Sequence, residues 1–307
     1  MKLIFFRGIK PNFGDELNVW MWPKLVEDLF DEDDSTIFLG IGSIIWNRFP
    51  KEQKKVVFGA GFGGYTAPPV IDENWKFYFV RGKLTAKTLG IDSSLGLGDA
   101  AILLRSCVTP NPQKHFKVSF MPHWQTTFEG NWEAACEHAG INYIDPCDTV
   151  DSVLEQIQAS ELVLTEAMHG AIVSDALRVP WIPIKPIQND HRSKWFDWAS
   201  ALNVEVKPVT VAGSTLVEST IQVLNGGLAP VTKSVIQKLN NRGRLCRAVK
   251  QIAPDYFIER AAKSLLHISH NSRPSLSADN AIESAHSHML TQFHQLIMDT
   301  GRGKLLV

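Results

Sequence analysis

The chain has 307 residues, of which 44% are hydrophobic and 21% charged, and its formal net charge at pH 7 is -1. This length allows two domains with cores of their own, and the composition excludes a disordered or fibrous protein. The near-neutral charge gives no general attraction to nucleic acid, so we expect no nucleic-acid partner. The four cysteines are scattered without a C-x-x-C pair, which argues against a disulfide framework or a structural zinc site.

The first residues contain one short apolar run, at positions 3–6 before Arg7. This run is too short for the apolar core of a signal peptide, and none elsewhere approaches the roughly 18 residues of a membrane span. We therefore expect a cytoplasmic protein, either free or bound peripherally to the inner face of the cytoplasmic membrane.

The first third of the chain alternates short apolar runs with loops rich in glycine and polar residues. The pattern predicts strands at 2–7, 36–39, 55–58 and 76–80, and helices at 16–30 and 83–89. In a parallel sheet the loops at the carboxyl ends of the strands form the ligand crevice. The side chains and glycines that we place there are Asn12, Asp15, Asn18, Gly42, Ser43, Gly61, Arg81 and Asp99.

Two of these residues have an alternative explanation. Asp15 is either a functional carboxylate or the N-cap of the helix that follows it. Arg81 is either an ordinary surface arginine or a bidentate receptor for a carboxylate or phosphate, and its strand-end position favours the second.

A glycine pattern at Gly59, Gly61 and Gly64 formally matches the dinucleotide-binding fingerprint G-x-G-x-x-G. The fingerprint requires a helix to open at these glycines, but Pro68 and Pro69 follow closely. We therefore reject a dinucleotide site, and expect these glycines to let a ligand or another part of the chain approach the backbone.

The pattern restarts after a proline-containing linker at 107–114. It predicts strands at 117–121, 142–144, 161–165, 181–184 and 204–207, and helices near 129–139, 150–159 and 167–178. We therefore expect an α/β fold with two Rossmann-like domains, 1–113 and 114–212, that face each other across a cleft.

Glu166 and His169 lie where the strand 161–165 meets the helix 167–178. A helix N-terminus at this edge favours an anion, so a group able to transfer a proton stands beside an anion site. A single histidine is about as often a packing residue, but the strand-end position favours a functional role. His123 follows the strand 117–121 in the same way.

Residues 213–307 predict a helical extension. Its segment 233–263 has eight Lys and Arg residues against two acidic ones. This segment is either a solvated helical face or a surface that docks on an anionic membrane. Residues 268–280 are rich in Ser, Asn and Pro and predict a flexible break.

Several motifs together resemble one family, the polysaccharide pyruvyltransferases or ketalases, and within it the succinoglycan-type exopolysaccharide enzymes. The motifs are the segments 6–7, 12–18, 40–43, 79–82, 98–100, 121–123 and 166–171. The resemblance implies a fold like that of GT-B glycosyltransferases. It implies phosphoenolpyruvate as donor and, as acceptor, a sugar of an exopolysaccharide or of its lipid-linked repeat unit. The products would be a cyclic pyruvate ketal and phosphate, and we expect no metal and no further cofactor.

The resemblance also assigns roles. His169 is the expected acid/base residue, with Glu166 or Asp15 as its partner, and the first domain is the expected acceptor side. Many members carry an arginine two residues before this histidine, where the present chain has Ala167. Donor binding therefore falls on the remaining candidates, which are Arg81, His123, Lys185, Arg192 and Ser43. The acceptor or cleft candidates are Asn12, Asn18, Gly42, Gly61 and Asp99.

Two other functions fit the same pattern. A nucleotide-sugar glycosyltransferase would use the same fold, glycine loops and helix N-termini, because a fold does not fix a function. A non-catalytic partner in polysaccharide assembly would explain the missing arginine at Ala167.

Overall fold

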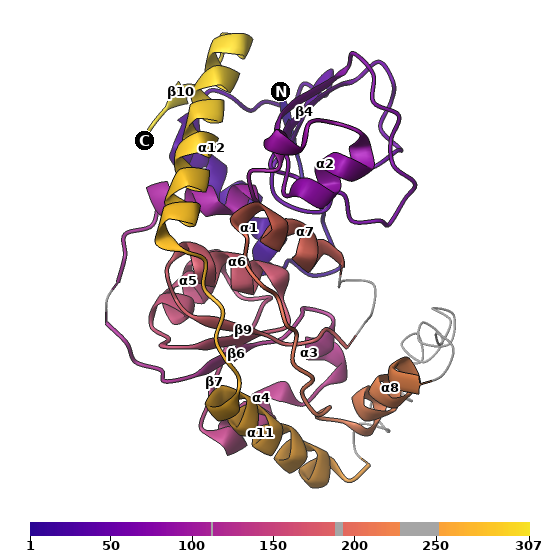
Figure 1. Cartoon of the computed structure of the whole chain (residues 1–307), viewed down its shortest axis with the longest axis vertical. Coiled ribbons are helices and arrows are strands. Elements are labelled where there is room, and N and C mark those ends of the chain that lie inside the picture. The colour runs from indigo at the N-terminus through magenta and orange to yellow at the C-terminus, as the bar shows by residue number, and fades with distance from the viewer. Residues whose placement is uncertain (112, 188–192, 228–251) are drawn as a thin grey trace.

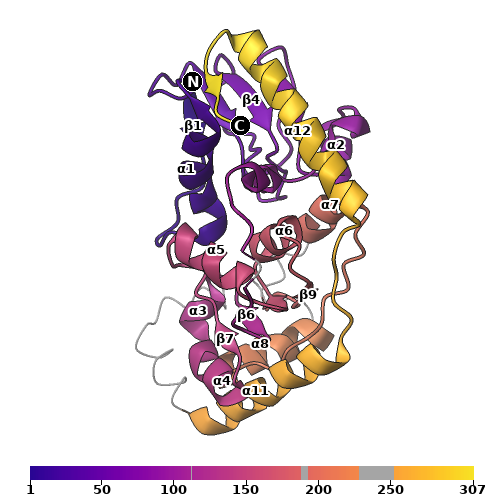
Figure 2. The same cartoon turned by 90° about the vertical axis from the view of Figure 1, so that its left-hand side faces the viewer.

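The computed structural model describes residues 1–111, 113–187, 193–227 and 252–307. Within these residues two four-stranded sheets lie one above the other (Figures 1 and 2). Every neighbouring pair of strands within the two sheets is parallel. The predicted α/β class, and the restart of the pattern in mid-chain, are confirmed.

The upper sheet has the order β1-β3-β4-β5 and the lower sheet the order β7-β6-β8-β9. The upper strands are β1 (Lys2–Ile4), β3 (Thr36–Leu39), β4 (Lys54–Phe58) and β5 (Trp75–Phe79). The lower strands are β6 (Ser119–Met121), β7 (Asn142–Tyr143), β8 (Val163–Thr165) and β9 (Trp181–Pro183).

Helices connect and cover these strands. In the upper half they are α1 (Phe13–Leu25), α2 (Lys83–Leu89), η1 (Ser93–Leu95) and η2 (Ala100–Ser106). In the lower half they are α3 (Thr126–Glu129), α4 (Trp132–Ala139), α5 (Val150–Gln158), α6 (Met168–Ala176), α7 (Ser193–Leu202) and α8 (Leu216–Gly227). The C-terminal helices are α11 (Pro254–Asn271) and α12 (Asp279–Thr300).

Local interactions explain where the helix α1 begins and ends and where the helix α2 ends. The helix α2 ends as predicted at Gly90, whose φ of 68° is the left-handed conformation that glycine adopts without strain. The helix predicted at 16–30 begins earlier, because the side chain of Asn12 caps it by accepting the backbone N–H of Asp15. It ends at Leu25, because Val26–Glu27 forms a short strand, β2, against β10 (Lys304–Leu305).

The strand predicted at 204–207 is wrong. The chain runs through this segment without ladder partners, and only Val209 forms an isolated bridge, with Ile184. The apolar side chain of Val206 is nevertheless buried. The hydrophobic pattern therefore indicated a buried segment correctly, but this segment does not pair as a strand.

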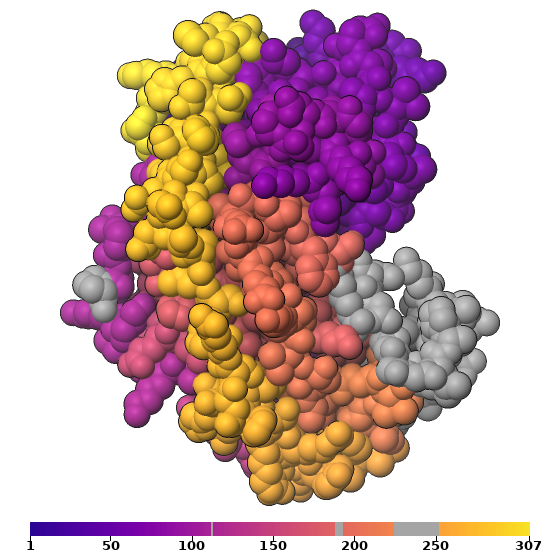
Figure 3. Space-filling view, in the orientation of Figure 1, coloured from indigo at the N-terminus to yellow at the C-terminus, as the bar shows by residue number. Residues whose placement is uncertain are grey.

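The C-terminal segment returns across both halves. The helix α11 packs against α4 of the lower half, whereas α12 contacts η2 and β5 of the upper half. In the space-filling view of Figure 3 this yellow segment runs over the surface from the lower half to the upper half. The two halves are therefore joined by a connection outside the linker at 107–114.

The flexible break predicted at 268–280 is also wrong. The connector between α11 and α12 exchanges two backbone hydrogen bonds with Trp181 through Ser275. Farther along it, Ser277 donates both its backbone N–H and its hydroxyl to Asp175. Because Asp175 is fully buried, its carboxylate needs these donors, and they hold the connector in place.

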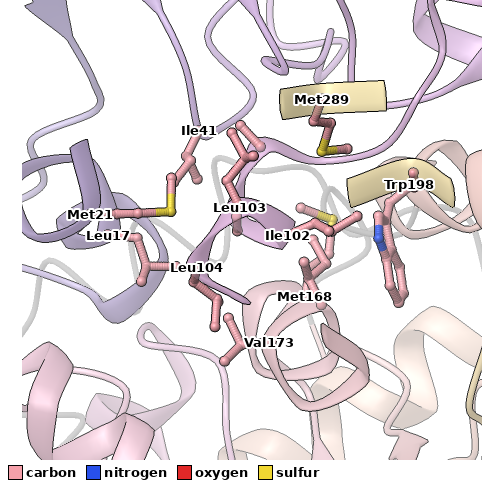
Figure 4. Packing of buried hydrophobic residues seen from close by; sticks show 14 of the residues in the cluster. Leu17, Met21, Ile41, Ile102, Leu103, Leu104, Met168, Val173, Trp198 and Met289 are labelled. Carbon is pink, nitrogen blue, oxygen red and sulfur yellow. The ribbon is translucent and has the colours of Figure 1, made fainter. Parts of the chain in front are cut away.

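One hydrophobic cluster spans the middle of the molecule. It contains Leu17 and Met21 of α1, residues of η2, Met168 of α6, Trp198 of α7 and Met289 of α12 (Figure 4). Apolar contact between the halves is thus continuous, and the carboxyl ends of the two sheets are held facing each other. Among the described residues no helix combines the length and apolarity needed to cross a membrane.

Candidate active site

A cavity of about 390 Å³ opens between the carboxyl ends of the two sheets. Its walls come from the loops after β1, β3 and β4 above, from those after β6, β7 and β8 below, and from α7. This is the edge at which both series of predicted strand-end residues were expected to meet.

His169 lies in the first turn of α6 and lines this cavity. Its Nε2 atom is 3.7 Å from the Oδ2 atom of Asp99, which is fully buried. The other carboxylate oxygen of Asp99 accepts the backbone N–H of Ala101 at 3.0 Å and so caps η2. The carboxylate therefore lies behind the imidazole within ion-pair range, but at 3.7 Å the two groups form no hydrogen bond.

The imidazole rests against Gly14 of α1. A Cβ atom at this position would lie 1.8 Å from the Nδ1 atom of His169, so only glycine leaves room for the ring. The upper half of the molecule thus shapes the pocket of a histidine that belongs to the lower half.

Two helix N-termini point to the same space, because the first residues of both α1 and α6 line the cavity. Unpaired N–H groups and helix dipoles make such positions favourable for anions. Asn12 caps α1, whereas Ala167 provides no side-chain cap for α6.

Asp15 lines the cavity beside His169. Its carboxylate accepts a short hydrogen bond from the side-chain amide of Asn12. Burial raises the pKa of Asp15, while the Asn12 hydrogen bond and the nearby charges of His169 and Lys194 oppose that shift. The alternative explanation of Asp15 as an N-cap is wrong, because Asn12 holds that position.

Glu166 does not contact His169, contrary to the expected partnership. Its two carboxylate oxygens accept the backbone N–H groups of His123 and Ile187, at 2.9 and 2.8 Å. Burial raises the pKa of this carboxyl, and the two backbone hydrogen bonds oppose the shift. Glu166 therefore ties the loop after β6 to the loop after β9, and Asp99 takes the place behind the histidine.

Arg81 is a buried ion-pair residue, which corrects both explanations that the sequence allowed. Its Nε atom donates to Asp197 at 2.9 Å, and its terminal nitrogens donate to Ser43 and to the carbonyl of Phe62. Its side chain is 0% exposed and is not part of the cavity wall. Gly61 does not line the cavity either, and its missing side chain leaves room for the Arg81 guanidinium.

Some of the other predicted site residues line the cavity, and others do not. Asn12, Gly42, Ser43 and His123 line the cavity. Asn18 is fully buried and hydrogen-bonds Ile41 and Trp22, so it is structural. Lys185 follows β9 but is absent from the cavity wall, and Arg192 lies outside the described residues.

Many wall residues were not among the predicted site residues, and three of them have side chains suited to binding a substrate. Lys194 enters from α7, and burial lowers its pKa to about 8, with Arg81 acting in the same direction and Asp15 opposing it. Trp46 and Trp124 form aromatic parts of the wall, and the guanidinium of Arg48 lies 3.8 Å from the ring centroid of Trp46. The abundance of tryptophan, nine in the chain, was the available signal for a carbohydrate-sized groove.

The cavity of this α/β fold brings together a histidine, an amine and two helix N-termini, an arrangement that favours an anionic ligand. The polysaccharide pyruvyl transferase family model matches residues 12–186. The chain is 38% identical over 226 residues to the succinoglycan biosynthesis protein ExoV of Rhizobium meliloti (strain 1021), a match that covers 72% of this chain and 71% of that protein. No solved structure matches the chain. The chain belongs to the polysaccharide pyruvyl transferase family and is a transferase.

Proposed function

We propose that this enzyme transfers the pyruvyl group of phosphoenolpyruvate to a saccharide in exopolysaccharide biosynthesis, forming a cyclic ketal and releasing phosphate. The observation that carries the proposal is His169, held between Asp99 and Gly14 in a cavity that favours anions. The family match and the likeness to a succinoglycan biosynthesis protein support the class of acceptor.

The reaction requires one proton at the terminal carbon of the donor, which leaves C2 electron-poor. One acceptor hydroxyl then bonds to C2 and gives up its proton, and the bond from C2 to the phosphate oxygen breaks. A second hydroxyl bonds to C2 to close the ring, and its proton balances the departing phosphate. In this scheme His169 delivers the first proton and accepts one from a hydroxyl, with Asp99 orienting the imidazole.

The two sides of the cavity suit the two substrates. Side-chain cations and helix N-termini can neutralise the donor, so the scheme needs no metal and no further cofactor. Trp46, in the wall from the upper half, offers an aromatic face to the C–H groups of a sugar ring. We therefore assign the acceptor to the wall from the upper half and the donor to the wall from the lower half.

Three finer parts of the expectation remain predictions. The GT-B-like arrangement rests on the resemblance together with the two facing parallel sheets. The lipid-linked form of the acceptor rests on the resemblance, and the peripheral membrane contact rests on the basic segment 233–263. Residues 233–251 of that segment lie outside the described residues.

The test is incubation of the enzyme with phosphoenolpyruvate and a panel of terminal glucosides, galactosides and mannosides. We expect phosphate release that depends on the acceptor, and a product whose mass corresponds to the sugar with a pyruvate ketal. Nucleotide release from a UDP- or GDP-sugar, without phosphate release from phosphoenolpyruvate, would instead identify a glycosyltransferase.

A further inference from the structure

Lys194 is a cation in the cavity wall, and the reaction scheme above gives it no individual role. It lies in the first turn of α7 and is partly buried, and it hydrogen-bonds none of the described residues. It also lies beyond the range that the family model matches, which ends at residue 186. An ammonium group that loses water without gaining an acceptor is costly, so its position calls for an anionic partner.

The carboxylates near Lys194 already have other partners. The charges of Asp15 and Asp99 act on it, but Asp15 accepts from Asn12 and Asp99 faces His169. Neither forms an ion pair with Lys194 in the described part of the chain. The amine thus remains available to an oxyanion that enters the cavity.

A hydrogen-bonded clamp fixes the helix that carries Lys194. One turn further along α7, Asp197 accepts from Arg81 at 2.9 Å and from the hydroxyl and backbone N–H of Thr85 at 2.6 and 2.8 Å. The backbone of α7 also passes so close to Gly82 that a Cβ there would lie 1.8 Å from the carbonyl oxygen of Asp197. The lower-half helix is therefore locked to the edge of the upper sheet.

The same clamp reaches the cavity wall from the other side. Arg81 donates to the hydroxyl of Ser43, a wall residue, at 2.6 Å, and to the carbonyl of Phe62 at 3.2 Å. One buried guanidinium thus joins α7 to the loops that follow β3 and β4. The position of the Lys194 amine depends on this network, because α7 has no other buried charged contact to the upper half among the described residues.

We propose that Lys194 binds an oxyanion of the donor, and that Arg81 is a positioning residue which holds Lys194 in place through Asp197. This inference rests on the proposed function for the identity of the donor. It replaces the sequence-based assignment of donor binding to Arg81 with an indirect role for that residue.

Calorimetric titration with phosphoenolpyruvate, without acceptor, tests the direct role of Lys194. We expect Lys194→Ala to weaken binding about 10- to 100-fold, and Lys194→Arg to stay within a few-fold of the parent. Lys117→Ala is the matched control, since it removes an exposed lysine of the same half that does not line the cavity, and it should bind as the parent does. Titration with inorganic phosphate and with pyruvate then identifies which donor oxyanion Lys194 contacts.

A double-mutant cycle tests the positioning role. Asp197→Asn keeps the shape of the clamp but removes its charge, and should weaken phosphoenolpyruvate binding in the parent protein. In the Lys194→Ala background the same change should cause no further loss, because the group that it positions is already absent. A merely structural contribution would lower affinity equally in both backgrounds and would overturn this part of the proposal.

The outcomes separate the inference from the proposed function. Unchanged phosphoenolpyruvate affinity in Lys194→Ala, or an equal loss in Lys117→Ala, overturns the role of Lys194 while the donor assignment stands. If the protein binds a UDP-sugar in a way that depends on Lys194 but does not bind phosphoenolpyruvate, the identity of the donor is wrong and the anion-binding role of Lys194 stands. Failure of the parent protein to bind phosphoenolpyruvate, phosphate and UDP-sugar overturns both.

Discussion

Both sheets are four-stranded and parallel, although their strand orders differ, and they present different chemistry at their carboxyl edges. The edge of the upper sheet brings Gly42, Trp46 and Tyr65 to the cavity, whereas the edge of the lower sheet brings His123 and His169. The difference follows from what packs above each strand end. The helix α7 covers Arg81 and Thr85 of the upper edge and engages them in the clamp, whereas the first turn of α6 lines the cavity. The lower edge therefore holds the histidine to which we assign proton transfer, and the upper edge shapes its surroundings.

The largest effect that this comparison predicts is the loss of the histidine at the lower edge. His169→Ala should reduce turnover by about 10²- to 10⁴-fold, the usual contribution of a positioned acid/base group. Phosphate release from phosphoenolpyruvate in the presence of an acceptor measures it. His294→Ala, on the exposed face of α12, is the control and should leave turnover unchanged. Near-normal turnover in His169→Ala would remove the acid/base assignment.

Gly14 tests whether the upper half shapes the reactive group. Gly14→Ala improves intrinsic helix propensity, so α1 should still form, but its Cβ collides with the His169 imidazole. We expect turnover to fall about 10²-fold, because a misplaced acid/base group loses most of its contribution. In a His169→Ala background the same substitution should cost nothing more. An equal further loss there would mean that Gly14 acts on something other than the histidine.

The pKa of Lys194, lowered to about 8, predicts an alkaline limit for donor binding. The amine is charged below this pKa and neutral above it, so affinity for the anionic donor should fall as the pH rises through about 8. The charged groups that act on Lys194 are Arg81, Asp15 and Asp99. Lys194→Arg stays charged in this range and should lose the alkaline limb of the pH profile of kcat/KM for phosphoenolpyruvate. If kcat/KM of Lys194→Arg still falls with the same midpoint at alkaline pH, another group causes that fall.

Trp46 tests the aromatic character of the upper edge, with a smaller expected effect. Trp46→Ala removes a ring face worth about 1 kcal/mol, which corresponds to a rise of about fivefold in the KM for the saccharide. Phosphoenolpyruvate affinity should not change, since the ring lies on the wall assigned to the acceptor. Steady-state kinetics with each substrate varied in turn separates the two constants. A change confined to the donor would reverse the assignment of the walls.

We expect the smallest effect on activity from a change in the α11–α12 connector, away from the carboxyl edges of both sheets. Ser277→Ala removes the hydroxyl that donates to the buried Asp175 and accepts from Arg178, so it should lower the free energy of unfolding by about 1–2 kcal/mol. Denaturant titration measures this change, and turnover below the unfolding transition should be unaffected. Ser275→Ala is the control in the same connector, because its side chain makes only a 3.5 Å contact with the carbonyl of Glu205.

Residue patterns were sufficient for the two sheets and for the position of His169 at the cavity. Alternating apolar runs located the strands, and β3 and α2 have the predicted bounds, because short-range burial and glycine chemistry decide such segments locally. The junction of strand and helix at His169 was equally visible, since both elements are contiguous in the chain.

Only the folded chain decides which polar residues reach the cavity. Arg81 and His169 both follow strands, yet the arginine is neutralised by Asp197, which lies 116 positions away, and the histidine is backed by Asp99 instead of its neighbour Glu166. Lys194 reaches the cavity through the packing of α7 on the upper half, which no local pattern encodes. Charged side chains are buried only where distant partners compensate them, and the identity of those partners is a property of the tertiary structure.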